Sequence, residues 1–162
     1  MKIPVILNDE KIILDANPEE KLLETLRRLE LFSVKEGCQK GKCGLCAVLL
    51  DGKPVPSCLV PVGTVKNSKI ETLEHFIKTP DGQDIQKGFS QAGITLCGFC
   101  NAARYFTAYN LINKPYKPES EEMEEIASSV DCSCTDDRKF INGMMYAMAN
   151  KHEREGRKHA GR

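Results

Sequence analysis

The 162-residue chain lacks tryptophan, has only three histidines and carries no excess of either charge. Lysine and arginine together number 23, as do aspartate and glutamate, so the charge balance gives no reason to expect a nucleic-acid partner. No apolar run approaches the length of a membrane span. The apolar start Met1–Leu7 is too short for a signal peptide, because Asn8-Asp9-Glu10 follows at once. We therefore expect a cytoplasmic protein that acts on neither a membrane nor a nucleic acid.

Motifs for nucleotide binding and for bond-making catalysis are also missing. The phosphate-binding and dinucleotide-binding glycine patterns do not occur, so flavin and nicotinamide must be bound by other chains if they are used. His75, His152 and His159 stand in no triad and in no metal-ligand spacing, and we expect His75 to lie on the surface. The sequence therefore offers no catalytic residue of its own.

Cysteine is the residue that the sequence does supply, with eight copies that divide into two sets of four. The first set has the order C-x4-C-x2-C followed by a fourth cysteine, which is the plant-type ferredoxin pattern for a [2Fe–2S] cluster. The second set combines C-x2-C with C-x-C. Disulfides would require export to an oxidising compartment, whereas thiolate ligands suit the cytoplasm. The sets are Cys38, Cys43, Cys46 and Cys58, and Cys97, Cys100, Cys132 and Cys134.

The loop around the first set has the composition that a cluster needs. Four thiolates must converge, with backbone N–H groups turned toward the sulfurs. Gly37, Gly41 and Gly44 allow the backbone to approach closely and to adopt positive φ. A zinc site with four cysteines is the alternative. Structural zinc sites usually join two close-set pairs, however, whereas three of these cysteines lie within nine residues. The spacing therefore favours iron and sulfide.

The second set is less specific when it is taken alone. A thioredoxin-like pair at Cys97 and Cys100 would leave Cys132 and Cys134 without a purpose, and no βαβ unit surrounds it. Two thiols at each of two helix–loop junctions can close around one metal centre. Zinc remains the alternative to a second [2Fe–2S] cluster there.

Strand and turn signals occupy the chain up to residue 76. We expect two hairpins, the second across Asp51-Gly52, and a late closing strand. Asn17 is expected to cap the one helix, with Pro18 at its first position. A small sheet over one helix is typical of the β-grasp fold of plant-type ferredoxins. The expected strands are Lys2–Leu7, Lys11–Leu14, Ala47–Leu50, Lys53–Val55 and Ile70–Leu73.

Helical signals occupy the chain from Pro80 onward. The expected helices are a segment that ends at Gly93, the segment Asn101–Asn113, a segment capped by Ser120, and a segment from about Asp137. Four short helices predict a compact four-helix bundle. The fold class is therefore α+β, with a β-grasp domain at residues 1–76, a helical domain at 77–150 and a charged C-terminal tail at 151–162.

Four short motifs around the cysteines occur together in one known family. They are Cys43-Gly44-Leu45-Cys46, Ser57-Cys58-Leu59, Cys97-Gly98-Phe99-Cys100 and Cys132-Ser133-Cys134-Thr135. With them the chain resembles, over almost its whole length, the small [2Fe–2S] subunit of the molybdenum hydroxylases. That family includes xanthine dehydrogenase, aldehyde oxidoreductase and carbon monoxide dehydrogenase.

The resemblance implies two [2Fe–2S] clusters, the first toward a flavin and the second beside a molybdopterin. It implies that the first four cysteines bind the first cluster and the last four bind the second. The partners would be a large molybdopterin-binding subunit and an FAD-binding subunit. The chain would then relay electrons between them in a xanthine dehydrogenase-like hydroxylase, without being catalytic alone. The alternatives are a zinc-binding interaction module and a two-cluster relay in another redox complex.

The chain departs from the usual pattern of that family in the residues next to its cysteines. Gln39 replaces a glycine, Leu96 replaces a glutamine, and Ser133 replaces an arginine. This chain has Asn101-Ala102-Ala103 where the family usually has Thr-Pro-Gly, and it has Asp136-Asp137 where the family usually has Gly-Tyr. All eight cysteines are kept, whereas the residues that face the pterin are not. Whether the partner holds molybdenum therefore stays open, and the substrate cannot be inferred because its pocket belongs to the large subunit.

Overall fold

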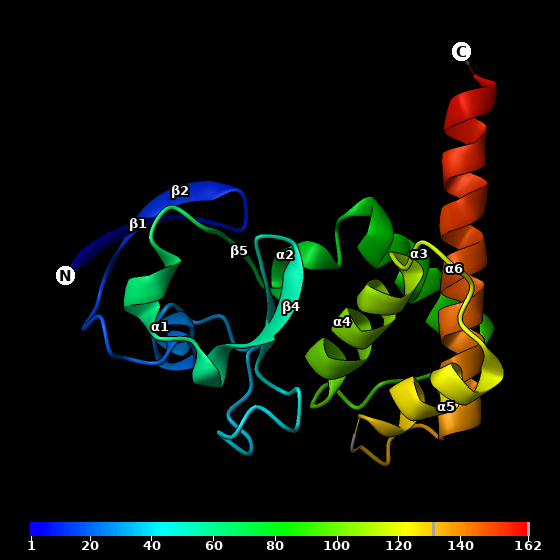
Figure 1. Ribbon diagram of the computed structural model, residues 1–162, viewed down its shortest axis with the longest axis horizontal. Coiled ribbons are helices and arrows are strands. Elements are labelled where there is room, and N and C mark those ends of the chain that lie inside the picture. The colour runs from blue at the N-terminus through cyan, green and yellow to red at the C-terminus, as the bar shows by residue number, and fades with distance from the viewer. Residues whose placement is uncertain (131, 162) are drawn as a thin grey trace. The chain divides into compact units, whose positions relative to one another are not determined.

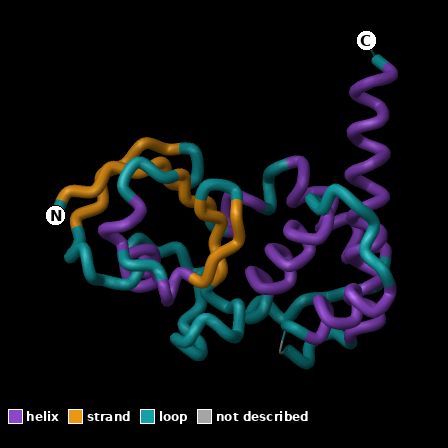
Figure 2. Tube along the Cα trace, viewed as in Figure 1, coloured by secondary structure: helices purple, strands orange, loops and turns teal. Residues whose placement is uncertain are grey.

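The computed structural model describes residues 1–130 and 132–161, in which the chain forms two compact units (Figure 1). The first unit comprises Met1–Phe76 together with Gly98–Phe106, and the second comprises Ile77–Cys97 together with Thr107–Arg162. Strands occur in the first of these stretches, and helices dominate from residue 80 onward (Figure 2). The domain ranges drawn from the sequence stay a prediction, and Arg162 of the predicted tail lies outside the described residues.

The first unit is built on a five-stranded mixed sheet with the order β2-β1-β5-β3-β4. Strands β1 and β5 are parallel, and the other neighbours are antiparallel. Both expected hairpins are present, and their two-residue turns have positive φ at Asn8 and Asp9 and at Asp51 and Gly52, as such turns require. The strands are β1 (Lys2–Leu7), β2 (Glu10–Asp15), β3 (Ala47–Leu50), β4 (Lys53–Pro56) and β5 (Lys69–Glu71).

One helix, α1 (Leu22–Arg28), packs its apolar face into the core of this unit. The predicted cap at Asn17 is wrong, because α1 begins only after Lys21. The N–H of Leu22 donates to the carbonyl of Val60 at 2.8 Å, and the N–H of Gly63 donates to the carbonyl of Pro18 at 2.9 Å. These bonds to a distant segment hold the residues after Asn17 out of the helix. The short elements that follow β4 are η1 (Ser57–Leu59), η2 (Val62–Val65) and α2 (Leu73–Phe76).

Four longer helices follow α2. The caps of two of them show why they start where they do. The Thr79 hydroxyl accepts the N–H of Gly82 at the start of α3, and the Asp136 carboxylate accepts the N–H of Lys139 at the start of α6. The predicted cap at Ser120 is wrong, since Glu119 occupies that position and makes no side-chain cap. The helices are α3 (Pro80–Gln91), α4 (Asn101–Ile112), α5 (Ser120–Ser128) and α6 (Asp137–Ala160).

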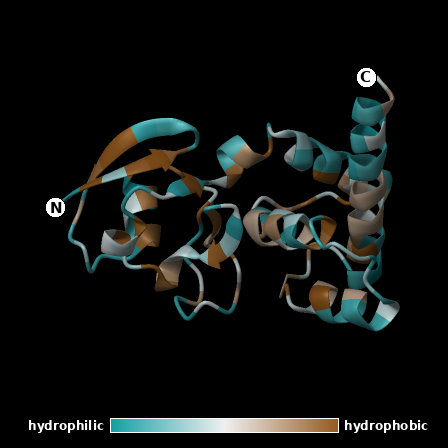
Figure 3. Cartoon of the chain, turned by 45° about the horizontal axis from the view of Figure 1, so that its top comes forward, coloured by the Kyte–Doolittle hydropathy of each residue, from teal (hydrophilic) through white to brown (hydrophobic). Residues whose placement is uncertain are grey.

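Helices α3 and α6 lie in close contact within the second unit. A Cβ atom on Gly88 would come within 2.5 Å of the backbone nitrogen of Ala147, so the crossing admits only glycine at this point. Beyond the crossing, Arg154 of α6 pairs with Asp81 at 2.6 Å and with Asp84 at 2.7 Å. Most of the predicted charged tail therefore belongs to α6, whose last turns are hydrophilic (Figure 3). Within residues 1–130 and 132–161, no helix is both long and apolar enough to cross a membrane.

Candidate metal centres

The first cysteine set lies in the first unit, with three cysteines in the loop between α1 and β3 and Cys58 in η1. The backbone N–H groups of Lys40, Lys42 and Cys43 donate to the Sγ atom of Cys38, with N···S distances of 3.4, 3.3 and 3.3 Å. The N–H of Cys38 donates in turn to the Sγ atom of Cys43 at 3.4 Å. These N–H groups stabilise negative charge on the sulfurs, and they lower the pKa of Cys38 to about 6. The loop is thus arranged to hold thiolates.

Backbone conformation explains the glycines of this loop. Gly41 and Gly44 have φ of 71° and 70°, in the left-handed region that favours glycine. A Cβ atom on Gly37 would lie 2.8 Å from the Cys43 Sγ atom, so any side chain there would press on a candidate ligand. Gln39 has φ of 53°, which explains the usual glycine at its position. Its amide oxygen accepts from the Lys21 ammonium at 2.8 Å, a contact that a glycine could not make.

Cys46 and Cys58 belong to the hydrophobic core of the same unit and are 3% and 2% exposed. Burial raises the pKa of the Cys58 thiol, and its hydrogen bond with the Cys46 thiol raises it further. A bound metal deprotonates a coordinating thiol outright, so this apolar site can hold both sulfurs as thiolates when metal is present. The core around them excludes water from that side of the site.

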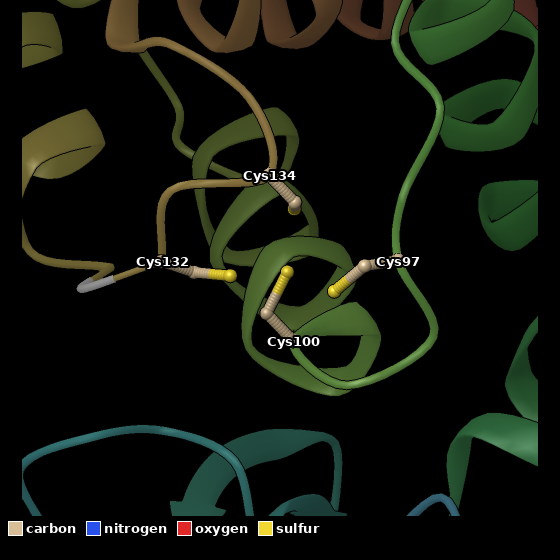
Figure 4. A group of neighbouring side chains, drawn as sticks. All are labelled: Cys97, Cys100, Cys132 and Cys134. Carbon is tan, nitrogen blue, oxygen red and sulfur yellow. The ribbon is translucent and has the colours of Figure 1, made fainter.

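The second cysteine set converges closely. The Sγ atoms of Cys97, Cys100, Cys132 and Cys134 all lie within 4.8 Å of one another (Figure 4). Cys100 is fully buried, directly before α4, and Cys97 is exposed. The other two lie in the loop between α5 and α6. Four convergent sulfurs are a donor set for an iron–sulfur cluster or for zinc, and the fold brings them together from two segments that are distant in the sequence.

Three residues near this second set differ from the usual family pattern, and the structure shows a contact of one and the exposure of the other two. The side-chain oxygen of Asn101 accepts the N–H of Gly98 at 3.1 Å, and Gly98 has φ of 86°. Asn101 therefore braces the turn between Cys97 and Cys100. Ser133 is exposed, and Leu96 is half-buried.

Two further residues have positions that the sequence analysis did not foresee. His75, expected at the surface, has a side chain that is only 26% exposed, with Nε2 at 3.0 Å from Asp9 and Nδ1 at 3.5 Å from Glu71. Arg104 in α4 is fully buried, although arginine is among the residues least often found inside proteins. No motif or spacing marks Arg104 in the sequence, because its burial depends on which face of α4 is covered by the fold.

Comparison with known proteins assigns each half of the chain to an iron–sulfur domain family. The family described as "2Fe-2S iron-sulfur cluster binding domain" matches residues 5–74, and the family described as "[2Fe-2S] binding domain" matches residues 72–145. The nicotinate dehydrogenase small FeS subunit of Eubacterium barkeri is 36% identical over 143 residues, covering 88% of this chain and 91% of that protein. The chain belongs to the family of small iron–sulfur subunits of the molybdenum hydroxylases.

Other members of this family are similar to this chain in sequence and in structure. The xanthine dehydrogenase iron-sulfur-binding subunit of Escherichia coli O157:H7 is 31% identical over 146 residues, covering 88% of this chain and 91% of that protein. The solved structure of quinoline 2-oxidoreductase from Pseudomonas putida 86 contains a chain that is 30% identical with a TM-score of 0.79, covering 94% of this chain and 96% of that one. The α+β fold class, with a ferredoxin-like part and a helical part, is confirmed.

Membership in the molybdenum hydroxylase family also decides between iron and zinc. As a small iron–sulfur subunit, the chain carries two [2Fe–2S] clusters and serves electron transfer in an oxidoreductase. Three features fit such clusters: the close approach of Gly37 to the Cys43 sulfur, the N–H groups that donate to the Cys38 sulfur, and the four convergent sulfurs of the second set.

Proposed function

We propose that the chain relays electrons from a large molybdopterin-binding subunit, through both clusters, to an FAD-binding subunit in the cytoplasm. In this proposal the first four cysteines hold one cluster, and the last four hold the other. The E. coli relative is named as a xanthine dehydrogenase subunit, which supports partners of this kind. Eight cysteines that serve as thiolate ligands suit a reducing compartment.

One contact carries the proposal of a relay through both centres. A Cβ atom on Gly44 would lie 3.1 Å from the Cβ atom of Ala103 and 3.7 Å from its Cα atom, so Gly44 packs closely against Ala103. Gly44 directly follows Cys43, and Ala103 follows Cys100 by three residues. Both residues belong to the first unit. The first cysteine loop therefore packs against the first turn of α4, which supports a short path between the proposed ligands Cys43 and Cys100.

The residues of the chain hold, orient and insulate the proposed centres. The clusters supply one-electron chemistry when they are bound. The N–H groups of Lys40, Lys42 and Cys43 stabilise sulfur charge at the first site, and the core around Cys46 and Cys58 keeps water away. Asn101 fixes the turn at Gly98 at the second site. None of these roles requires chemistry on an organic substrate.

Metal analysis and two substitutions test this assignment of ligands. Two [2Fe–2S] centres require about four irons and four sulfides per chain in anaerobically purified protein. We expect Cys43→Ser to remove one paramagnetic signal from the reduced protein, and Cys132→Ser to remove the other. Loss of both signals from either folded variant would contradict two separate sites, and stoichiometric zinc without labile sulfide would contradict the clusters themselves.

A relay in a complex without the standard pterin contact is the second candidate. It is favoured by Leu96, which offers no amide, and by Asn101, whose side-chain oxygen is engaged by Gly98. Co-purification with native partners, followed by molybdenum analysis of the complex, separates the two candidates. One molybdenum per complex supports the hydroxylase, and a complex that is active in electron transfer without molybdenum supports the second candidate.

A further inference from the structure

A buried arginine lies in the helix that starts at the second cysteine set. Arg104 is 0% exposed and is the largest side chain among the fully buried residues that the structure describes. A guanidinium group stays protonated in proteins. Removing such a charge from water is costly unless negative charge lies close by. An anion is therefore expected within reach of Arg104.

Helix geometry places Arg104 on the same side of α4 as Cys100. Arg104 follows Cys100 by four residues, and its N–H donates to the Cys100 carbonyl at 3.0 Å. Residues four apart share a face of a helix, and helical side chains lean toward the N-terminus, over the preceding turn. The preceding turn here is the one that presents Cys100. The Sγ atom of Cys100 lies within 4.8 Å of the sulfurs of Cys97, Cys132 and Cys134.

We propose that Arg104 is a positioning residue whose buried positive charge raises the reduction potential of the centre held by Cys97, Cys100, Cys132 and Cys134. This inference rests on the proposed function, since it assumes that these cysteines hold a cluster. Reduction by one electron adds one negative charge to the centre, and a fixed positive charge nearby favours that state.

Burial distinguishes Arg104 from other cations close to the cysteines in sequence. Lys40 and Lys42 in the first cysteine loop and Arg138 near the start of α6 are all exposed, so water and salt screen their charges. Ser133, where the family pattern has an arginine, is exposed as well. The charge of Arg104 acts through the protein interior, where electrostatic interactions are stronger.

A redox titration of the full chain, followed by electron paramagnetic resonance, tests the proposal. The variant Arg104→Met removes the charge and keeps an apolar side chain of similar length. We expect its equilibrium constant for reduction to fall by about tenfold at the centre whose signal Cys132→Ser removes. The other centre in the same sample should keep its potential. Arg138→Met, the matched loss of an exposed cation, should leave both potentials unchanged.

Three outcomes overturn the proposal: unchanged potentials in a loaded Arg104→Met protein, equal shifts at both centres, or an equal shift in Arg138→Met. If Arg104→Met does not retain the cluster, Arg104→Gln and Arg104→Lys extend the test. Loading of the lysine variant alone supports a requirement for charge, whereas failure of all three variants indicates a packing role and overturns it. Iron and sulfide analysis of the parent chain shows separately whether the proposed function itself has failed.

Discussion

At the scale of single residues, backbone conformation around the cysteines separates positions that need glycine from positions that tolerate another residue. Gln39 has positive φ and makes a side-chain bond to Lys21, so its strain is offset by a contact. Gly44 combines positive φ with close packing against Ala103. Gly52 also has positive φ, but no atom lies within 4 Å of the place that a Cβ would take. A comparison of Gly44 with Gly52 therefore separates the cost of a positive φ from the cost of a steric contact.

We expect Gly44→Ala to destabilise the loaded protein more than Gly52→Ala does. Gly52→Ala should cost about 1 kcal/mol, from the left-handed backbone alone. Gly44→Ala should cost about 1 kcal/mol more, because its new methyl group would press on Ala103. Urea unfolding followed by circular dichroism measures both losses. The double variant Gly44→Ala with Ala103→Gly should recover the added part, and equal losses in the two single variants would show that the contact is loose.

How far the sequence revealed single site residues depends on the kind of interaction involved. The eight cysteines could be proposed as ligands because ligand spacing is a property of the chain itself, and the order of the first four distinguishes a ferredoxin-like loop from paired zinc motifs. The burial of Arg104 could not be foreseen, because it depends on which face of α4 is covered. The position of His75 between Asp9 and Glu71 was hidden for the same reason, since these residues meet only in the fold.

At the scale of elements, local signals predicted the hairpins and the helices, and long-range hydrogen bonds changed their ends. Asp51-Gly52 encodes its turn directly, because both residues tolerate positive φ. Asn17 has the chemistry of a cap, but its side-chain oxygen accepts the N–H of Glu19 outside the helix, and the carbonyl of Pro18 accepts the N–H of Gly63. A cap residue in the sequence therefore predicts a helix start only where no distant segment forms hydrogen bonds with the backbone that follows it.

Glu74 in α2 ties that helix to the segment that leads into the first cysteine loop. Its carboxylate accepts the N–H of Ser33 at 2.8 Å and the Ser33 hydroxyl at 2.5 Å. Burial works to raise the pKa of Glu74, but hydrogen bonds from Ser33 and Thr72 outweigh it and hold the pKa below its ordinary value. The carboxylate is thus stabilised in its charged form by folding, and its contribution should depend on pH.

We expect Glu74→Gln to destabilise the protein at pH 7 by about 1 kcal/mol. The folded-state pKa of Glu74 lies below its unfolded value, so its contribution to stability is present above the unfolded pKa and is lost as pH falls through the folded one. The difference between the parent and the variant should therefore shrink below about pH 4. Thermal unfolding across that range measures it, with Glu124→Gln on an exposed position as the control. A difference that is constant with pH would assign the effect to packing.

At the scale of the whole molecule, the chain does not divide into its two compact units at a single point. The stretch Gly98–Phe106 returns to the unit that contains the sheet, although it begins a helix and follows α3. Phe106 is buried against Phe76 there, with ring centroids 5.2 Å apart. Sequence signals could not predict this return, because strand and helix patterns change once, near residue 76, and suggest one boundary. The proposed ligand Cys100 lies inside the returning stretch.

The returning stretch leads to a prediction that compares two buried residues of the same helix, α4. Phe106 belongs to the unit with the sheet, and Leu111, which is 1% exposed, belongs to the other unit. We expect Phe106→Ala to destabilise the first unit by about 3 kcal/mol, since it removes a buried aromatic ring that packs on Phe76. The paramagnetic signal that Cys43→Ser removes should then be lost at a lower urea concentration. Leu111→Ala removes a comparable buried side chain but should leave the urea midpoint of that signal near the parental value. If both substitutions shifted that midpoint equally, α4 would act as one rigid element, and the division of the chain within it would have no energetic meaning.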